Sequence, residues 1–197
     1  MEDEARSEER PDTRVGTVLE GRYQIIRKLG EGGMGAVYEA HHMRVGKTVA
    51  IKCLHPHLAT DSGVVSRFQR EAQAASLARN EHIVDVLDRG TFPDGAPYLV
   101  MELLVGRDLS QLIKEAGPLP IGRAIHIVRQ ACNGLLAVHA KGIVHRDLKP
   151  GNVFLVQTRS DPDFVKLLDF GISKLNESHE SVHGGLTKTG APIGTPY

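Results

Sequence analysis

The sequence predicts an α+β protein in two parts, a small antiparallel sheet with one helix followed by a mainly helical part. Two observations favour this class. Short runs rich in β-branched residues, broken by glycines, fill much of the first half of the chain. The second half instead contains a long segment with apolar residues at helical spacing, residues 121–141. Strands and helices that are segregated along a chain in this way are typical of α+β folds.

The first half is expected to form a five-stranded antiparallel sheet with one helix. The first three strands are predicted at residues 23–30, 35–42 and 47–54. A helix should follow, because Phe68, Ala72 and Ala75 recur at helical spacing and Asp61 or Ser62 is a suitable N-terminal cap. Two further strands flank a Pro-Asp-Gly turn, which favours a hairpin. This lobe should cover residues 19–104.

The second half, residues 105–197, is expected to be mainly helical. A short helix is predicted at "DLSQLIKEAG" and a long one over 121–141, with Gly142 as its stop. The long helix carries one apolar stripe, formed by Ile121, Ile125, Val128, Cys132, Leu135 and His139. The runs "NVFLV" and "FVKLLDF" favour a second hairpin. The remaining residues, rich in glycine, serine, threonine and histidine, predict a long loop.

Composition and charge exclude several classes of function. The 24 basic and 24 acidic residues balance, so no overall field attracts nucleic acid or an anionic membrane. Because no apolar run reaches about 18 residues, we expect no membrane segment in this chain and a cytoplasmic location. Cys53 and Cys132 are too few for a disulfide framework and are predicted to be buried. Residues 1–18, charged and poor in apolar side chains, are predicted to be a disordered tail.

A glycine-rich stretch, "GEGGMGAV", places Gly30, Gly32 and Gly35 at the spacing G-x-G-x-x-G. Glycines let backbone amides approach phosphate oxygens because no Cβ stands in the way. A dinucleotide-binding turn would need a helix after this motif, whereas "AVYEAHH" alternates as a strand. The stretch is therefore either the tip of a hairpin lying over a ligand or an ordinary glycine-rich turn.

A lysine follows on the predicted strand "VAIK". Period-2 alternation places Ala50 and Lys52 on one face of that strand and the neighbouring apolar residues on the other. A small residue beside a lysine suits a planar ring and its phosphates, although a surface lysine is the alternative. Glu71, on the following helix, is suited to pair with Lys52, or it is a solvated helix charge.

Five polar or charged residues gather between two apolar runs in "IVHRDLKPGNVFLV", residues 143–156. They are His145, Arg146, Asp147, Lys149 and Asn152. Burying such groups costs free energy unless they pair or hold a ligand. The stretch is therefore either a solvated loop or the floor of a site.

In their order along the chain, these motifs resemble those of the eukaryotic-like protein kinases, specifically the bacterial serine/threonine kinases. The order is "GEGGMGAV", "VAIK", "REAQAA" with Glu71, "HRDLKPGN", "DFG" and "GTPY". The resemblance runs from about residue 21 to the C-terminus. It implies a protein-kinase-like two-lobe fold with a complete N-lobe and only the first part of the helical C-lobe, ending in the activation segment. Because family members continue beyond "GTPY", it also implies a C-terminally truncated chain.

The resemblance implies ATP and Mg²⁺ as cofactors and phosphoryl transfer to serine or threonine of protein substrates. Asp147 would accept the proton of the substrate hydroxyl, and Lys149 would neutralise the γ-phosphoryl group. Asn152 and Asp169 would hold the metal ions, since hard divalent cations prefer oxygen ligands. His145 is expected to pack against the "DFG" turn.

The resemblance also implies a nucleotide pocket and a regulatory element. The pocket would be formed by Leu29, Gly30, Gly32, Gly35, Val37, Ala50, Lys52, Met101, Glu102, Leu104 and Phe154. Arg146 is expected to be a buried charge that an incoming phosphate neutralises, and Thr187 and Thr189 resemble sites of self-phosphorylation. Autophosphorylation would require self-association.

Three hypotheses remain open from the sequence. The first is a serine/threonine kinase, with the activity of a truncated chain left undecided. The second is an ATP-binding remnant that transfers little phosphate, and the third is an interaction scaffold. The full set of charged residues argues against the scaffold, because such a cluster is costly to bury without a ligand.

Overall fold

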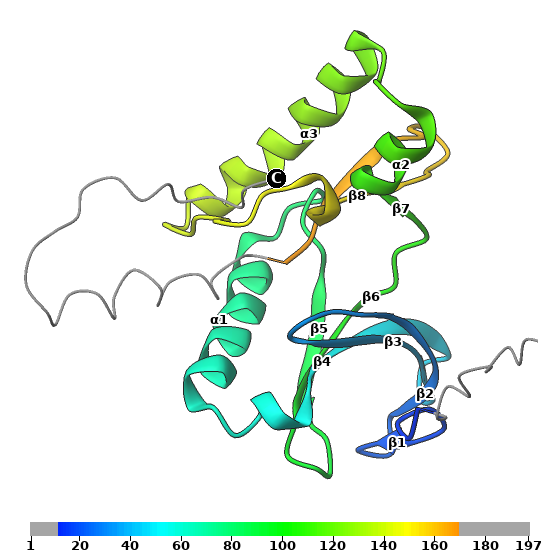
Figure 1. Ribbon diagram of the computed structural model, residues 1–197, viewed down its shortest axis with the longest axis vertical. Coiled ribbons are helices and arrows are strands. Elements are labelled where there is room, and N and C mark those ends of the chain that lie inside the picture. Colours follow the sequence, from blue (N-terminus) through cyan, green and yellow to red (C-terminus); the bar gives the residue numbers. More distant parts are fainter. Residues whose placement is uncertain (1–11, 170–197) are drawn as a thin grey trace, which may run out of the picture.

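The computed structural model of this chain describes residues 12–169. Figure 1 shows a curled sheet with helix α1 beside it at one end of the molecule and helix α3 at the other end. Strand β6 leads from the sheet towards the second part of the chain. The two-lobed arrangement expected from the sequence is therefore confirmed.

The N-lobe sheet has six strands in the order β1-β2-β3-β4-β6-β5, and all of their pairings are antiparallel. The strands are β1 (Val18–Leu19), β2 (Tyr23–Glu31), β3 (Gly35–His42), β4 (Lys47–Leu54), β5 (Val86–Thr91) and β6 (Pro97–Glu102). The first three predicted strands are confirmed to within one residue. The prediction of five strands is wrong by one, because two-residue β1 is too short to show a periodicity.

The segment that precedes β2 packs against the sheet. The Tyr38 hydroxyl donates to Asp12 Oδ2 at 2.9 Å. Arg14 forms an ion pair of 2.9 Å with Asp94, and its guanidinium lies 4.3 Å from the centre of the Phe92 ring. The prediction of a disordered tail is therefore wrong for residues 12–18, because a composition argument does not register partners that lie far away in the sequence.

The two faces of β4 pack against different parts of the N-lobe. Val49, Ile51 and Cys53 are buried in the outer core of the sheet, as the alternation predicts. Helix α1 (Ser62–Ala78) covers the other face and is capped by Asp61, which accepts from the amides of Gly63 and Val64 at 2.8 and 3.1 Å. Its residues Phe68 and Ala72 pack against Leu54 and Leu99.

The second lobe combines helices with a three-stranded sheet of order β7-β8-β9. Its elements are β7 (Gly106–Asp108), α2 (Leu109–Ala116), α3 (Ile121–His139), β8 (Val153–Val156) and β9 (Phe164–Leu167). Two short 3₁₀ helices, η1 (Pro56–Leu58) and η2 (Pro150–Asn152), complete the described elements. Within residues 12–169, no helix combines the length and apolar character needed to cross a bilayer.

Helix α3 buries a different face from its predicted apolar stripe. Ile127, Ala131 and Val138 are buried against the β8–β9 hairpin, whereas Ile125 of the stripe is 61% exposed. Cys132 is also exposed, so the prediction that both cysteines are buried holds for Cys53 alone. The cause is position: Cys132 lies on the part of α3 that turns away from β9.

Candidate active site

A cleft of about 920 Å³ lies between the two lobes. From the N-lobe, the cleft is lined by the turn between β2 and β3 (residues 30–35, called the glycine-rich tip below), by β4 and by the segment after β6. From the second lobe, it is lined by residues around Lys149, Phe154 and Asp169. All eleven residues expected to form the nucleotide pocket line this cleft: Leu29, Gly30, Gly32, Gly35, Val37, Ala50, Lys52, Met101, Glu102, Leu104 and Phe154. Sequence reasoning missed Phe68, Val84 and Leu168, which also line it and have no local signal beyond being apolar.

The glycine-rich tip is a tight turn between β2 and β3. Within it, the amide of Gly32 donates to the carbonyl of Gly35 at 2.8 Å. A Cβ at Gly35 would lie 1.8 Å from the backbone oxygen of Cys53, so another residue cannot fit there without moving β4. Close approach of two strands therefore requires this glycine, in addition to any contact with a ligand.

An ion pair spans the cleft. Lys52 Nζ, from β4, lies 2.6 Å from Asp169 Oδ1, which follows β9. Asp169 has a backbone φ of +44°, in the left-handed region that residues with a Cβ seldom adopt. Charge-assisted bonds of this length are stronger than neutral ones and bring the lysine and the carboxylate together at one point. Glu71 lies on α1, but its side chain is outside the described set.

A second polar cluster surrounds Asp147 on the loop before η2. Lys149 Nζ lies 3.0 Å from Asp147 Oδ2. Buried Asn152 donates from Nδ2 to both the carbonyl and Oδ2 of Asp147, at 2.8 and 3.1 Å. Three of the five residues that crowd this stretch of sequence thus contact one another, which fixes the carboxylate of Asp147.

His145 connects this loop to the segment after β9 that carries Asp169. Its Nε2–H donates to the carbonyl of Leu168 at 2.9 Å, and the amide of Leu168 donates to the carbonyl of Asn152 at 2.9 Å. His145 is 2% exposed, and this burial lowers the pKa of its imidazole. The expected packing of His145 against the "DFG" turn stays a prediction, because residues 170 and 171 lie outside the described residues; the contact that is described is with Leu168, directly before that turn.

The residues expected to be regulatory are only partly described. Arg146 is exposed and adopts a φ of +62°, so the prediction that it is a buried charge is wrong. Its neighbours His145 and Asp147 are buried and half-buried, so they take the interior positions of this loop and leave Arg146 at the surface. Thr187 and Thr189 lie outside the described residues.

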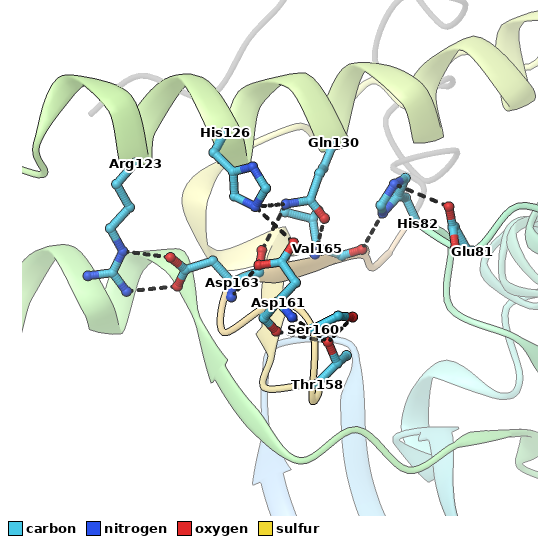
Figure 2. A network of polar contacts seen from close by, with 10 residues as sticks. All are labelled: Glu81, His82, Arg123, His126, Gln130, Thr158, Ser160, Asp161, Asp163 and Val165. Atoms are coloured by element: carbon cyan, nitrogen blue, oxygen red, sulfur yellow. Dashed lines mark hydrogen bonds and ion pairs between the residues drawn. The ribbon is translucent and has the colours of Figure 1, made fainter.

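Side chains from α3 hold the hairpin that delivers Asp169 (Figure 2). Gln130 accepts from the amide of Val165 at 3.1 Å and donates to the carbonyl of Asp163 at 3.0 Å. About two turns earlier on α3, Arg123 donates two hydrogen bonds to the Asp163 carboxylate, at 2.8 and 2.7 Å. His82 reaches the carbonyl of Val165 at 3.0 Å from the opposite direction. These supporting contacts could not be predicted from the sequence, because the residues that make them lie far apart along the chain.

The oxygen donors near the cleft suit a hard divalent cation. Asn152 uses its Nδ2 on Asp147, and no described residue donates to its Oδ1. The carboxylate of Asp169 is about half exposed and lines the cleft. An amide oxygen and a carboxylate are the ligand types that Mg²⁺ takes from proteins, with its other positions left to water and phosphate.

The chain is similar in sequence to a known protein family over most of its length. The family model for the protein kinase domain matches residues 23–196. Serine/threonine-protein kinase Pkn1 of Myxococcus xanthus is 45% identical over 177 residues, which cover 89% of this chain and 24% of that protein. Serine/threonine-protein kinase PknD of Mycobacterium tuberculosis is 40% identical over 175 residues, which cover 89% of this chain and 25% of that protein. The chain thus spans about a quarter of the length of these relatives.

A solved structure shows the same fold. The kinase domain of Mycobacterium tuberculosis PknI superimposes with a TM-score of 0.67 at 35% sequence identity. The match covers 80% of this chain and 62% of that domain. The protein-kinase-like architecture expected from the motifs is therefore confirmed.

Proposed function

Because this chain belongs to the protein kinase family, we propose that it binds Mg-ATP and carries the groups that transfer the γ-phosphoryl group to a serine or threonine of a protein. The observation that carries the proposal is the convergence in one cleft of the glycine-rich tip, the Lys52–Asp169 ion pair and Lys149. Phosphoryl transfer depends mainly on positioning and on neutralising charge, and these groups supply both.

The roles of the chain's residues follow from their chemistry. Lys52 neutralises charge on the phosphates from the N-lobe side of the cleft. Asp147, held by Asn152, accepts the proton of the substrate hydroxyl while the hydroxyl oxygen forms a bond to the γ-phosphorus and the bond from that phosphorus to the β–γ bridging oxygen breaks. Lys149 neutralises the transferred group, and ADP is the leaving group.

Asn152 and Asp169 would hold the divalent cation, which screens the phosphate charges when bound. The adenine would lie between Val37 and Ala50 on one side and Phe154 on the other, all of which line the cleft. Leu104 offers a backbone amide for the adenine edge, since this amide has no acceptor among residues 12–169.

We place the partner proteins among those with accessible serine or threonine, with a second copy of this chain as an acceptor at Thr187 and Thr189. Exposed Arg146 would bind a phosphate group at these positions through charge-assisted hydrogen bonds. Dependence on ATP is consistent with a cytoplasmic location.

The variant Asp147→Asn tests the catalytic assignment. It keeps the size of the side chain but removes the proton acceptor, so we expect the phosphoryl transfer rate to fall by about 10²–10⁴ while the affinity for Mg-ATP stays unchanged. The assay would follow radiolabelled γ-phosphate into an acceptor protein rich in serine and threonine. Asp85→Asn, at an exposed aspartate of the N-lobe, is the matched control.

Three outcomes separate the hypotheses. Equal transfer by the Asp147→Asn variant and the unchanged chain would refute the role of Asp147. Binding of Mg-ATP without any transfer by the unchanged chain would favour an ATP-binding remnant. Absence of nucleotide binding altogether would refute the proposed function.

A further inference from the structure

His55, the residue after β4, contacts the glycine-rich tip at two points. Its ring Nε2–H donates to the carbonyl of Gly32 at 2.8 Å, and its backbone amide donates to the carbonyl of Met34 at 3.0 Å. The backbone contact continues the β3–β4 ladder by one position beyond the Gly35–Leu54 pair. The side-chain contact is different in kind, because it reaches across the turn to its first residue.

Several features hold the His55 ring in place. Pro56 follows, and a residue before proline is restricted to extended backbone, as the φ of −63° and ψ of 143° of His55 show. The ring stacks on that of His57, with centroids 5.5 Å apart and planes 14° from parallel. Glu31 Oε1 lies 3.8 Å from Nε2, and a carboxylate there favours the tautomer with a proton on that nitrogen. His55 is thus prepared to act as a donor.

Because a peptide bond is planar, the contact to the carbonyl of Gly32 also sets the direction of the amide of Gly33. The carbonyl of Gly32 and the amide of Gly33 belong to one trans peptide unit, so they point in opposite directions. When His55 holds the carbonyl, the amide of Gly33 must point away from His55. Gly33 lines the cleft, and the amides of Gly33 and Met34 have no acceptor among the described residues.

We propose that His55 is a positioning residue for nucleotide binding, which fixes the glycine-rich tip so that the amide of Gly33 faces the phosphates. This inference rests on the proposed function, because it assumes that a triphosphate lies beneath the tip. His55 contributes to the affinity for the phosphates of the nucleotide. It does not contribute to the affinity for the adenosine part, which contacts other residues.

The test measures binding of Mg-ATP and of adenosine by titration calorimetry to the chain and three variants. His55→Leu removes the side-chain donor and keeps the backbone contact, so we expect the Kd for Mg-ATP to rise by about three- to tenfold, as the loss of one hydrogen bond predicts. The Kd for adenosine should stay unchanged. His55→Gln, whose amide keeps an N–H donor at similar reach, should regain most of the affinity for Mg-ATP.

His41→Leu is the matched control, because His41 lies on β3 away from the tip, opposite Thr48 of β4. An unchanged Kd for Mg-ATP in His55→Leu would overturn the inference. So would an equal loss of affinity for adenosine and Mg-ATP, which would mean that His55 supports the lobe as a whole. If the unchanged chain binds adenosine and Mg-ATP equally or binds neither, the proposed function itself fails, and the inference fails with it.

Discussion

At the scale of single residues, His145 shows how a buried imidazole can join two parts of a site. Its Nε2–H holds the carbonyl of Leu168, next to Asp169, while the residue itself stands two positions before Asp147. One side chain therefore sets the spacing between the loop of the proposed base and the segment after β9 that carries the proposed metal ligand. The contact needs only an N–H donor, which the neutral ring already provides.

The burial of His145 also predicts that the stability of the fold depends on pH. Burial lowers the pKa of the imidazole below its ordinary 6.5, so the unfolded chain binds a proton at a higher pH than the folded chain does. The stability contributed by the neutral ring is fully present above pH 6.5 and is lost as the pH falls from there towards the folded-state pKa. We expect His145→Gln to reduce the fall in the free energy of unfolding between neutral and acidic pH.

Urea unfolding followed by circular dichroism at pH 7.5 and at pH values below 6.5 measures this slope. His139→Gln, at an exposed histidine in the last turn of α3, is the control and should leave the slope unchanged. A slope that is the same in His145→Gln and in the original chain would contradict the prediction.

At the scale of elements, the outer edge of β9 is closed without a full neighbouring strand. One edge of β9 pairs with β8. On the other edge, Val165 gives its amide to Gln130 and its carbonyl to His82, and Leu167 pairs with the backbone of residues 82–84. Every one of these bonds satisfies a backbone group that would otherwise be buried unpaired. Helix α3 thus acts as a partner for a strand through the amide of one side chain.

Replacing Gln130 should therefore cost stability. Gln130→Ala would leave the amide of Val165 and the carbonyl of Asp163 without partners in a buried position, since Gln130 is 5% exposed. We expect the free energy of unfolding to fall by about 1–3 kcal/mol or more, the cost of leaving buried polar groups unpaired. Chemical denaturation would measure the loss, with exposed Arg129→Ala as the control on the same helix. A loss no larger than that of the control would contradict the role of Gln130.

The same elements show what the sequence could and could not predict. β2, β3 and β4 were predictable because they are runs rich in β-branched and apolar residues that glycines separate along the chain. The buried face of α3 was not, because the helix has apolar residues on more than one side. Gln130 and Gly134 belong to the buried side but do not look apolar. A Cβ at Gly134 would lie 3.2 Å from the backbone of His82, so close packing, and not hydropathy, selects that face.

At the scale of the whole molecule, contacts among the described residues connect the two lobes beside the cleft. Two of them are ion pairs, Lys52–Asp169 and Lys166–Glu102, each at 2.6 Å. The segment after α1 adds backbone contacts, in which the amide of Leu167 donates to the carbonyl of His82 at 2.8 Å and the amide of Val84 donates to the carbonyl of Leu167 at 3.2 Å. The residues of the proposed site were predictable because their motifs are local. These connections were not, because the segment 82–84 shows its partner only once the chain has folded.

A ligand that contacts both lobes should stabilise the molecule as one unit. At a free Mg-ATP concentration 100-fold above its Kd, we expect the free energy of unfolding to rise by about 2.7 kcal/mol, with a matching rise in the Tm. Removing the metal with a chelator should abolish most of this rise, because the phosphates would then lie beside the carboxylate of Asp169 without a cation between them. Differential scanning calorimetry measures both conditions on the same preparation.

Asp169→Asn should show the same loss without a chelator. It removes the carboxylate that pairs with Lys52 at 2.6 Å and that would hold the cation, so Mg-ATP should raise the Tm of this variant much less than that of the original chain. Asp85→Asn, which alters an exposed carboxylate on the N-lobe, should keep the full rise. A rise that is equal with and without the metal, and equal in Asp169→Asn, would mean that the nucleotide contacts only the N-lobe, and the two halves of the cleft would then not act together.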